Sequence, residues 1–278
     1  MSLAATLANT SLSTRNAVAF GDCVDCARTH TLPAGQARRY ALGMMDEFER
    51  LQRLDYLARE VDADPSFSFA TLFAGRGNMF GVLECVDAKG GTVFLRAFSA
   101  LAGGVRLIDG WVPPVLSQEV YEDVILPAQQ EIKSLTKQKD RLEASGARTG
   151  ETEVRRRGVS QALWERMCSE YKLQNFRGEV STLEQAALPG APITGGMGEC
   201  CAPKLLTFAS RNGLRPVGIA EFFWNGRASQ VHGSEPIESE AGPNLDLLKG
   251  SRVSGEFYPS CEARCQPILG FMLCGLNT

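Results

Sequence analysis

Four cysteines near the carboxyl end of this chain have types and spacings that could hold a metal ion. Cys200 and Cys201 are adjacent in GECCAPKLL, and Cys261 and Cys265 lie four residues apart in PSCEARCQP. Each group lies beside a proline that suits a helix start, where the dipole and free amides stabilise thiolates. On a helix, residues four apart share one face, so the second pair is expected to point together. Three thiolates would leave zinc open for catalysis, whereas four would close it into a structural site.

Two glutamates close to these thiols are candidates for moving protons. Glu199 directly precedes the doublet, and Glu221 lies in the apolar segment GIAEFFW. A carboxylate buried in an apolar strand needs a partner or a raised pKa, which is typical of functional sites. The simpler interpretations are a helix-start acid for Glu199 and a solvent-facing or loop-capping acid for Glu221.

A second group of potential ligands occurs near the amino terminus, in GDCVDCARTH. Cys23, Cys26 and His30 form a C-x2-C pair followed by a histidine, and they could supply three ligands of a second zinc ion. The fourth ligand is missing from that segment, and a pair of ordinary thiols in a flexible leader is the alternative. The remaining cysteines are interpreted as core residues: Cys85, Cys168 and Cys274.

Composition limits the class of protein. The chain has 278 residues, nine cysteines and a net charge of -3. An odd number of cysteines cannot all pair within one chain, so we expect a reducing, cytoplasmic compartment with thiolates used for metal. The first twenty residues lack the pattern of a secretory signal, although organellar targeting stays open. No apolar run is long enough to predict a membrane span.

Hydrophobic periodicity and turn residues predict an α/β protein. The expected elements are a helix over 33–62, a hairpin of 79–86 with 92–101, two charged helices within 117–173, a strand at 218–224 and a short final helix. The predicted organisation has three parts: a leader over 1–32, a helical segment over 33–75, and a domain over 76–278 that carries the helical insertion 117–173.

The inserted helices carry a local positive charge. Residues 131–157 contain eight Lys or Arg and five Asp or Glu, a local charge of +3 within a negative chain. The densest basic cluster consists of Arg155, Arg156 and Arg157. It is either a solvated helix face or a phosphate-binding arm, and we expect it to contact RNA if the arm binds phosphate.

The order hairpin, cysteine helix, strand and cysteine pair resembles the cytidine deaminase fold. The segments GECCAPKLL, NGLRPVGIAEFFW and FYPSCEARCQPILGFML are more closely similar to a bacterial family of tRNA-modifying proteins. In that family a deaminase-like domain and a long tRNA-holding helical arm precede a pseudouridine synthase domain, and the activity is C-to-U editing followed by pseudouridine formation. The resemblance covers roughly residues 76–276. It implies a three-layer α/β/α sandwich with an inserted helical arm and one zinc ion.

This sequence departs from the family pattern at three points. No synthase motif occurs in it, so we expect at most the deamination half of the reaction. The second cysteine pair is C-x3-C instead of C-x2-C. Deaminases carry a glutamate two residues after the first ligand, and counting from Cys200 that position is Ala202. Cys200 is nevertheless the preferred first ligand, because it aligns Leu205 and Leu206 with the apolar pair of the deaminase helix.

The resemblance implies a zinc-dependent hydrolase that deaminates cytidine in RNA, with tRNA as the expected substrate. Water would attack C4, a glutamate would move the proton, and ammonia would leave. Tyr258, next to the ligands, is expected to contact the base. One alternative is an inactive deaminase fold that keeps a structural zinc and binds RNA as the partner of a separate pseudouridine synthase. Another is a deaminase of DNA or of a free nucleotide, and the latter would not need the arm.

Overall fold

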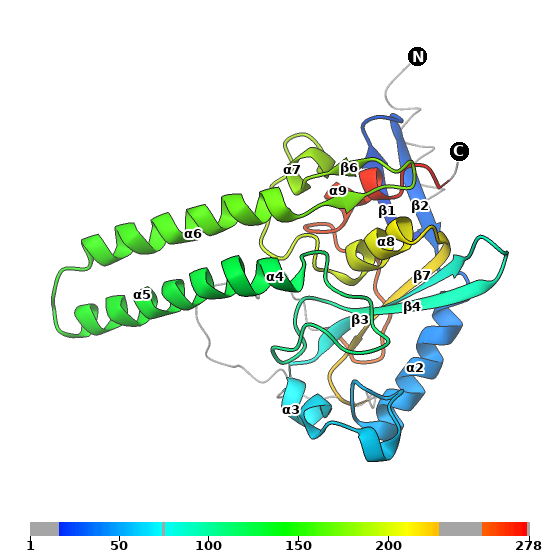
Figure 1. Cartoon of the computed structure of the whole chain (residues 1–278), viewed down its shortest axis with the longest axis horizontal. Helices are drawn as coiled ribbons and strands as arrows, with labels where there is room; N and C mark the ends of the chain where they lie inside the picture. Colours follow the sequence, from blue (N-terminus) through cyan, green and yellow to red (C-terminus); the bar gives the residue numbers. More distant parts are fainter. Residues whose placement is uncertain (1–16, 74–75, 228–251, 277–278) are drawn as a thin grey trace.

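The computed structural model describes residues 17–73, 76–227 and 252–276. Within these residues the chain is a mixed α/β protein, as the sequence predicts, with helices packed around small antiparallel sheets. Two long helices run side by side and project from this body (Figure 1). Among the helices of the described ranges, none combines the length and the apolar composition that a bilayer span requires.

The central sheet has three strands in the order β4-β3-β7, and both outer strands run antiparallel to β3. Its strands are β3 (Asn78–Val86), β4 (Thr92–Phe98) and β7 (Arg215–Trp224). Asp87 closes the hairpin between β3 and β4, because its Oδ1 accepts hydrogen bonds from the backbone nitrogens of Lys89 at 2.8 Å and Gly91 at 2.7 Å. The predicted hairpin and the predicted strand over 218–224 are therefore confirmed as neighbours in one sheet.

The two faces of this sheet belong to two different cores. On β3, Phe80 and Val82 pack with α2 (Ala37–Leu51), whereas Leu83 packs on the opposite face with α8 (Cys201–Arg211). Side chains alternate between faces along a strand. On β7, Phe222 therefore belongs to the α2 side, and its neighbour Glu221 faces α8.

The amino-terminal helix is shorter than predicted. The sequence predicts a helix over 33–62, but α2 ends at Leu51. Gln52 adopts a left-handed conformation with φ of 52°, and its backbone nitrogen donates to the Phe48 carbonyl at 2.9 Å, which ends the helix. The chain continues through short helical turns: η1 (Glu60–Asp62), η2 (Pro65–Phe67) and α3 (Phe69–Phe73).

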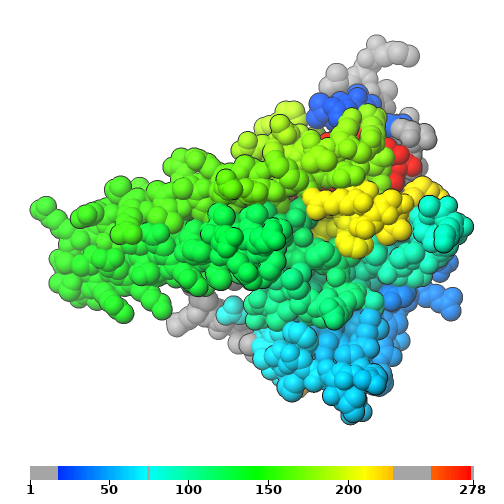
Figure 2. Space-filling model, in the orientation of Figure 1, coloured from blue at the N-terminus to red at the C-terminus, as the bar shows by residue number. Residues whose placement is uncertain are grey.

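The charged segment forms the projecting pair of helices, which we call the helical arm. Its long helices are α5 (Leu126–Ala144) and α6 (Gly150–Glu170), and the arm extends well beyond the body (Figures 1 and 2). The turn between them includes Gly146, which has a φ of 72°. The chain enters the arm through α4 (Gln118–Val120) and η3 (Tyr121–Ile125). The prediction of two helices within 117–173 is confirmed.

The last helix begins later than the cysteine pair suggests. We expected Cys261 and Cys265 to share a helix face, but α9 (Gln266–Met272) starts only after Cys265. Both cysteines instead lie in a tight turn, in which the backbone nitrogens of Cys265 and Gln266 donate to the Cys261 carbonyl at 3.1 Å. Pro267 explains the difference, because a proline lacks the N–H of a helix interior and is tolerated in the first turn.

The predicted boundaries between three parts of the chain do not coincide with the boundaries of the two hydrophobic cores. Residues within the expected leader form a hairpin of β1 (Ala17–Cys23) with β2 (Arg28–Pro33), and this hairpin packs against α9. The helix α2 shares a core with the central sheet, so the expected boundary at residue 75 does not separate two packed units. The remaining described elements are β5 (Leu173–Gln174), β6 (Val180–Ser181) and α7 (Leu183–Ala186).

Candidate metal centres and buried acids

Three of the four cysteines near the carboxyl end meet in space. The sulfurs of Cys200, Cys261 and Cys265 all lie within 4.8 Å of one another, and those of Cys261 and Cys265 are 3.6 Å apart. Cys200 is the N-cap of α8, and the other two come from the turn before α9. These residues form what we call the three-thiol centre, which could hold a metal ion.

The thiols of this centre influence one another strongly. Contact with Cys200, and then with Cys265, lowers the pKa of Cys261, while contact with Cys261 is the main cause that raises the pKa of Cys200 to about 12. A bound cation would favour the thiolate form of all three, because metal binding to cysteine releases protons.

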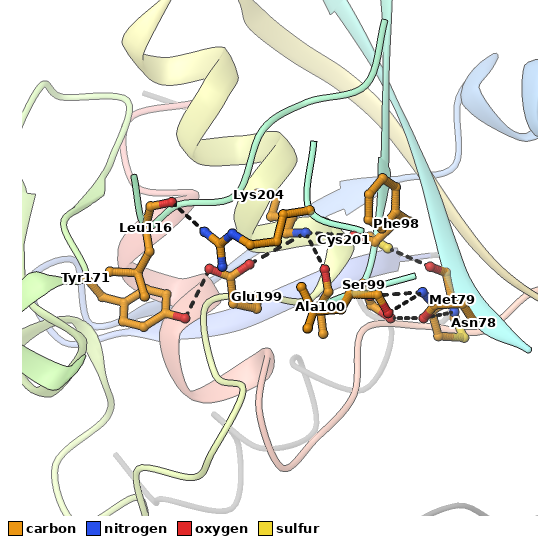
Figure 3. A network of polar contacts seen from close by, with 12 residues as sticks. Asn78, Met79, Phe98, Ser99, Ala100, Leu116, Tyr171, Glu199, Cys201 and Lys204 are labelled. Atoms are coloured by element: carbon orange, nitrogen blue, oxygen red, sulfur yellow. Dashed lines mark hydrogen bonds and ion pairs between the residues drawn. The ribbon is translucent and has the colours of Figure 1, made fainter. Parts of the chain in front are cut away.

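Cys201 does not join this centre, contrary to its prediction as a ligand. Its side chain is fully buried, and its Sγ lies 3.3 Å from the Met79 carbonyl oxygen on β3 (Figure 3). Consecutive residues at a helix start point in directions about 100° apart. Cys200 therefore faces Cys261 and Cys265, whereas Cys201 faces the central sheet. Within the described residues the doublet therefore contributes one sulfur, that of Cys200.

Glu221 lies against both segments that carry these ligands. Its Oε1 accepts a hydrogen bond from the backbone nitrogen of Ala202 at 3.1 Å, and its Oε2 accepts one from the Ser260 hydroxyl at 3.1 Å. Ala202 follows Cys200 by two residues, and Ser260 directly precedes Cys261. Burial raises the pKa of the Glu221 carboxyl to about 7, against the opposing effect of the Ser260 hydrogen bond. The solvent-facing interpretation of Glu221 is wrong, since only 4% of the residue is exposed.

Glu199 is also buried, but it is held by a different network. Its Oε1 accepts a hydrogen bond from the Tyr171 hydroxyl at 3.0 Å, and its Oε2 lies 3.5 Å from Lys204 Nζ. Lys204 also donates to the carbonyl oxygens of Phe98 at 2.9 Å and Ala100 at 3.2 Å (Figure 3). Burial lowers the pKa of Lys204. Glu199 is therefore paired with a buried lysine and a buried tyrosine, and its predicted catalytic role stays a prediction.

A second cluster forms where the amino-terminal hairpin meets the end of the chain. Ligand atoms of Cys23, Cys26, His30 and Cys274 all lie within 4.8 Å of one another, and the sulfurs of Cys26 and Cys274 are 3.4 Å apart. We call this the Cys3His centre, and it could also hold a metal ion. Burial lowers the pKa of His30, and the nearby Arg28 and Arg177 act in the same direction, which favours neutral imidazole.

Cys274 is the residue that sequence reasoning missed, because it was interpreted as a core side chain. It is indeed buried, but it lies beside the other three ligands. Two features of the sequence indicate it: the segment GDCVDCARTH supplies only three ligands, and Cys274 is a cysteine elsewhere in the chain that could supply the fourth. Cys85 and Cys168 are buried as expected, and neither belongs to either cluster.

The backbone of Tyr258 contacts Glu221, the acid beside the three-thiol centre. Its nitrogen donates to the Glu221 carbonyl at 2.9 Å, and its hydroxyl accepts a hydrogen bond from the Val253 nitrogen at 2.8 Å. The ring is half-buried, and the Arg252 guanidinium lies 5.5 Å from its centroid. The hydroxyl thus has a backbone partner and the ring has a cation beside it, and the expected contact of Tyr258 with a base stays a prediction.

The three arginines of the basic cluster are paired with acids of the helical arm. Arg155 lies 2.7 Å from Glu131, and both Arg156 and Arg157 lie 3.0 Å from Glu153. Hydrogen bonds from Arg156, and then from Arg157, lower the pKa of Glu153 to about 2. The cluster is therefore less positive than the run RRR suggests, although exposed ion pairs of this kind are weak.

One cluster offers three sulfur donors and the other offers three sulfurs and an imidazole, in both cases from distant parts of the chain. Donors of these types suit metal ions such as zinc. The three-thiol centre has a buried carboxyl beside it, and the Cys3His centre has an imidazole as its fourth group. No protein-family model, curated protein or solved structure matches this chain, so its chemistry is inferred from these two centres.

Proposed function

We propose that the three-thiol centre is a hydrolytic zinc site, and that the chain deaminates cytidine in RNA. The observation that carries this proposal is the position of Glu221, a buried carboxyl hydrogen-bonded to both segments that supply the thiols. A hydrolytic metal site needs an open coordination position and a nearby group that moves protons. The geometry supplies candidates for both.

The thiols fit zinc in number and spacing. Tetrahedral zinc with Zn–S distances of about 2.3 Å places its sulfurs about 3.8 Å apart. The separation of 3.6 Å between Cys261 and Cys265 is close to that value. Among the described residues the cluster has three ligand groups, so one position of a tetrahedral ion would remain for water. Thiolates also disfavour magnesium and calcium, which prefer oxygen ligands.

Glu221 supports deamination because of where its carboxyl lies. The deaminase motif places its glutamate two residues after the first ligand, and that position here is Ala202. The Ala202 backbone nitrogen donates to Glu221 Oε1, so a carboxyl from β7 lies next to the position that the motif would fill. We infer that Glu221 replaces the missing residue.

In this reaction cytidine and water give uridine and ammonia. A zinc ion, when bound, supplies a Lewis acid that lowers the pKa of a coordinated water. Glu221 would pass one proton of the attacking water to N3 of the base and the other to the exocyclic amine. The amine would then leave C4 as ammonia, and the water oxygen would become the C4 carbonyl of uridine. A carboxyl buried among protein donors can do both steps, because its pKa lies nearer neutrality than that of an exposed glutamate.

The helical arm supports RNA as the substrate class. It extends away from the body, and its segment 131–157 carries the local charge of +3, as a phosphate-binding arm would (Figures 1 and 2). The arginine pairs on it are exposed, so phosphates could compete for them. The resemblance of segments such as GECCAPKLL to a tRNA-modifying family is an expectation from sequence that favours tRNA as the substrate, and the free cysteines favour a cytoplasmic location.

A second candidate is a deaminase fold that keeps zinc but has no activity and binds RNA beside a separate pseudouridine synthase. The same hydrogen bonds favour it, because both carboxyl oxygens of Glu221 already have protein donors, as a purely structural buried acid requires. The two candidates differ in one measurable respect, which is turnover.

The test is the variant Glu221→Gln, assayed for C-to-U conversion in unmodified tRNA transcripts, single-stranded DNA and free cytidine. We expect turnover to fall by about 100-fold or more, because an amide cannot transfer the proton, while zinc content stays that of the wild type. Glu199→Gln is the matched control, since it makes the same change at a second buried acid, where the single amide oxygen can accept from only one of Tyr171 and Lys204. It should lower stability but keep the turnover of the folded fraction.

Each alternative result has a definite meaning. Equal turnover of wild type and Glu221→Gln would show that Glu221 is not the proton-transfer group and would remove the main support of the proposal. A wild-type protein that holds zinc at the three-thiol centre but converts none of the three substrates would favour the inactive RNA-binding candidate. Conversion of DNA or free cytidine, but not of tRNA, would change the substrate class only.

A further inference from the structure

We propose that the Cys3His centre binds a second zinc ion in a closed structural site, and that this ion fixes helix α9 against the amino-terminal hairpin. The proposal does not depend on deamination. It concerns four residues, Cys23, Cys26, His30 and Cys274, that belong to the first and last described segments of the chain.

The ligand set matches structural zinc in type, number and burial. Three thiols and one imidazole make a complete tetrahedral set, and all four ligand atoms lie within 4.8 Å of one another. Cys23, His30 and Cys274 are buried, and Cys26 is half-buried. A site with four protein ligands has no position for water or substrate, so its role is to hold segments together.

An independent observation points to a ligand at this site. His30 is 2% exposed, and its Nε2 has no hydrogen-bond partner among the described residues. A buried polar atom without a partner costs stability, and native structures rarely contain one without a reason. Coordination of a metal by the imidazole would account for its burial among three thiols.

The surroundings of the site suit a bound ion. Zinc with three thiolates and a neutral imidazole carries a net charge of -1. The Arg177 guanidinium donates a hydrogen bond to Cys26 Sγ at 2.9 Å, which places a positive charge beside that sulfur. The same loop also holds the backbone of the fourth ligand, because the Phe176 nitrogen donates to the Cys274 carbonyl at 2.9 Å. Such outer contacts orient metal ligands and tune their charge.

The site joins two elements whose backbones already touch. A Cβ added to Gly270 on α9 would lie 1.8 Å from the Asp22 carbonyl oxygen on β1, and one added to Gly21 would lie 2.4 Å from the Gly270 nitrogen. Only glycine permits this approach. Cys23 ends β1, and Cys274 lies two residues beyond the end of α9, so an ion would connect these two elements beside their contact.

The helix that this ion would fix also begins at the three-thiol centre. Cys265 is the N-cap of α9, and Cys274 lies two residues after its last residue, Met272. A helix of seven residues is marginal without tertiary support. Fixing its carboxyl end therefore also helps to position the turn that carries Cys261 and Cys265.

A disulfide between Cys26 and Cys274 is the competing explanation, because their sulfurs are 3.4 Å apart. Such a disulfide would not explain why the ligand atoms of Cys23 and His30 lie in the same cluster. A disulfide bond requires an S–S distance of about 2.05 Å, and both Cys26 and Cys274 are free cysteines in the structure.

The experiment begins with the zinc content of protein purified under reducing conditions without chelators. We expect two equivalents in the wild type and one in Cys261→Ser, because that variant loses the three-thiol centre only. X-ray absorption at the zinc edge of Cys261→Ser should then show three sulfur ligands and one nitrogen ligand. This spectrum examines the Cys3His centre with its own residues unchanged, so the test does not depend on a variant of that centre folding.

The reciprocal variant completes the test. Cys274→Ser should lose one equivalent and melt at a lower temperature, whereas Cys168→Ser, a buried cysteine outside both clusters, should keep two equivalents. Absence of zinc from Cys261→Ser, a zinc environment without nitrogen, or a Cys26–Cys274 disulfide found by peptide mass mapping would overturn the proposal. None of these results bears on the activity of the Glu221→Gln variant, so the two proposals can fail separately.

Discussion

Each of the two clusters of this protein contains three cysteines, and the clusters differ in the groups that lie beside those cysteines. The three-thiol centre has a buried carboxyl, Glu221, hydrogen-bonded to its flanking residues Ala202 and Ser260. The Cys3His centre has the imidazole of His30 as a fourth ligand group and a hydrogen bond from Arg177 to one of its sulfurs. One cluster is therefore complete without any further ligand, and the other is not.

This difference of one ligand group separates two kinds of chemistry. A complete set of four protein ligands holds an ion but gives no access to it, so it can only join parts of the chain. A set of three leaves a position for water, and an acid beside it can transfer protons. Because α9 begins at one cluster and ends at the other, the complete site supports the geometry of the incomplete one.

Metal removal should show this difference most strongly. With a competing chelator we expect zinc to leave in two phases, the faster from the three-thiol centre by about tenfold or more, because a three-ligand site is more accessible and has fewer bonds to break. Turnover should disappear with the first equivalent, and ordered structure with the second, since structural zinc contributes to folding directly. Zinc release, turnover and circular dichroism would be followed on the same sample.

The variant Cys261→Ser provides the control for this experiment, because it should show the slow phase alone. A single phase in the wild type, with turnover and ordered structure lost together, would mean that the two centres do not differ in the way their ligand sets indicate.

The cysteine doublet gives a sharper test of which residues form the three-thiol centre. Cys200→Ser should lose one zinc equivalent, whereas Cys201→Ser should lose none. The second variant should be destabilised by only about 1 kcal/mol, because serine is nearly isosteric and its hydroxyl can donate to the Met79 carbonyl that Cys201 Sγ now contacts. Zinc content and chemical denaturation would measure both effects. Loss of zinc from Cys201→Ser would contradict the observed orientation of the doublet.

Local patterns in the sequence were sufficient to predict several elements. The β3–β4 hairpin follows from two β-rich runs joined by DAKGG, and the helical arm follows from two charged segments separated by a Gly-containing turn. The lengths of helices were less well predicted. The end of α2 depends on the left-handed conformation of Gln52, and the start of α9 depends on Pro267.

The composition of the sites depended on contacts that sequence spacing cannot show. Cys26 and Cys274 are 248 residues apart in the chain, so no local motif connects them. The roles of Glu199 and Glu221 were not distinguishable either, because Lys204 lies one helical turn beyond the doublet and only the fold turns it toward Glu199. In contrast, the convergence of Cys200 with the second pair was expected from two cysteine-bearing helix starts, and the structure brings them together.

The smallest expected effect concerns the helical arm, which carries neither cluster. Glu153 pairs with both Arg156 and Arg157, so the variant Glu153→Gln should release two guanidinium groups and raise the affinity for tRNA transcripts by about threefold at low salt. The pKa of Glu153 is lowered to about 2, so its pairing stabilises the arm above its ordinary pKa and is lost only as the pH falls through about 2. At neutral pH the pairs are therefore intact, and the substitution removes them.

Glu143→Gln is the matched control for this substitution. It removes the same charge from the same arm, but it releases Lys139 and leaves the arginine cluster paired. If the cluster contacts phosphate, Glu153→Gln should strengthen binding and steepen its salt dependence more than Glu143→Gln does, and joint replacement of Arg155, Arg156 and Arg157 by Gln should weaken both. Equal changes in the two Gln variants would show that tRNA senses only the overall charge of the arm.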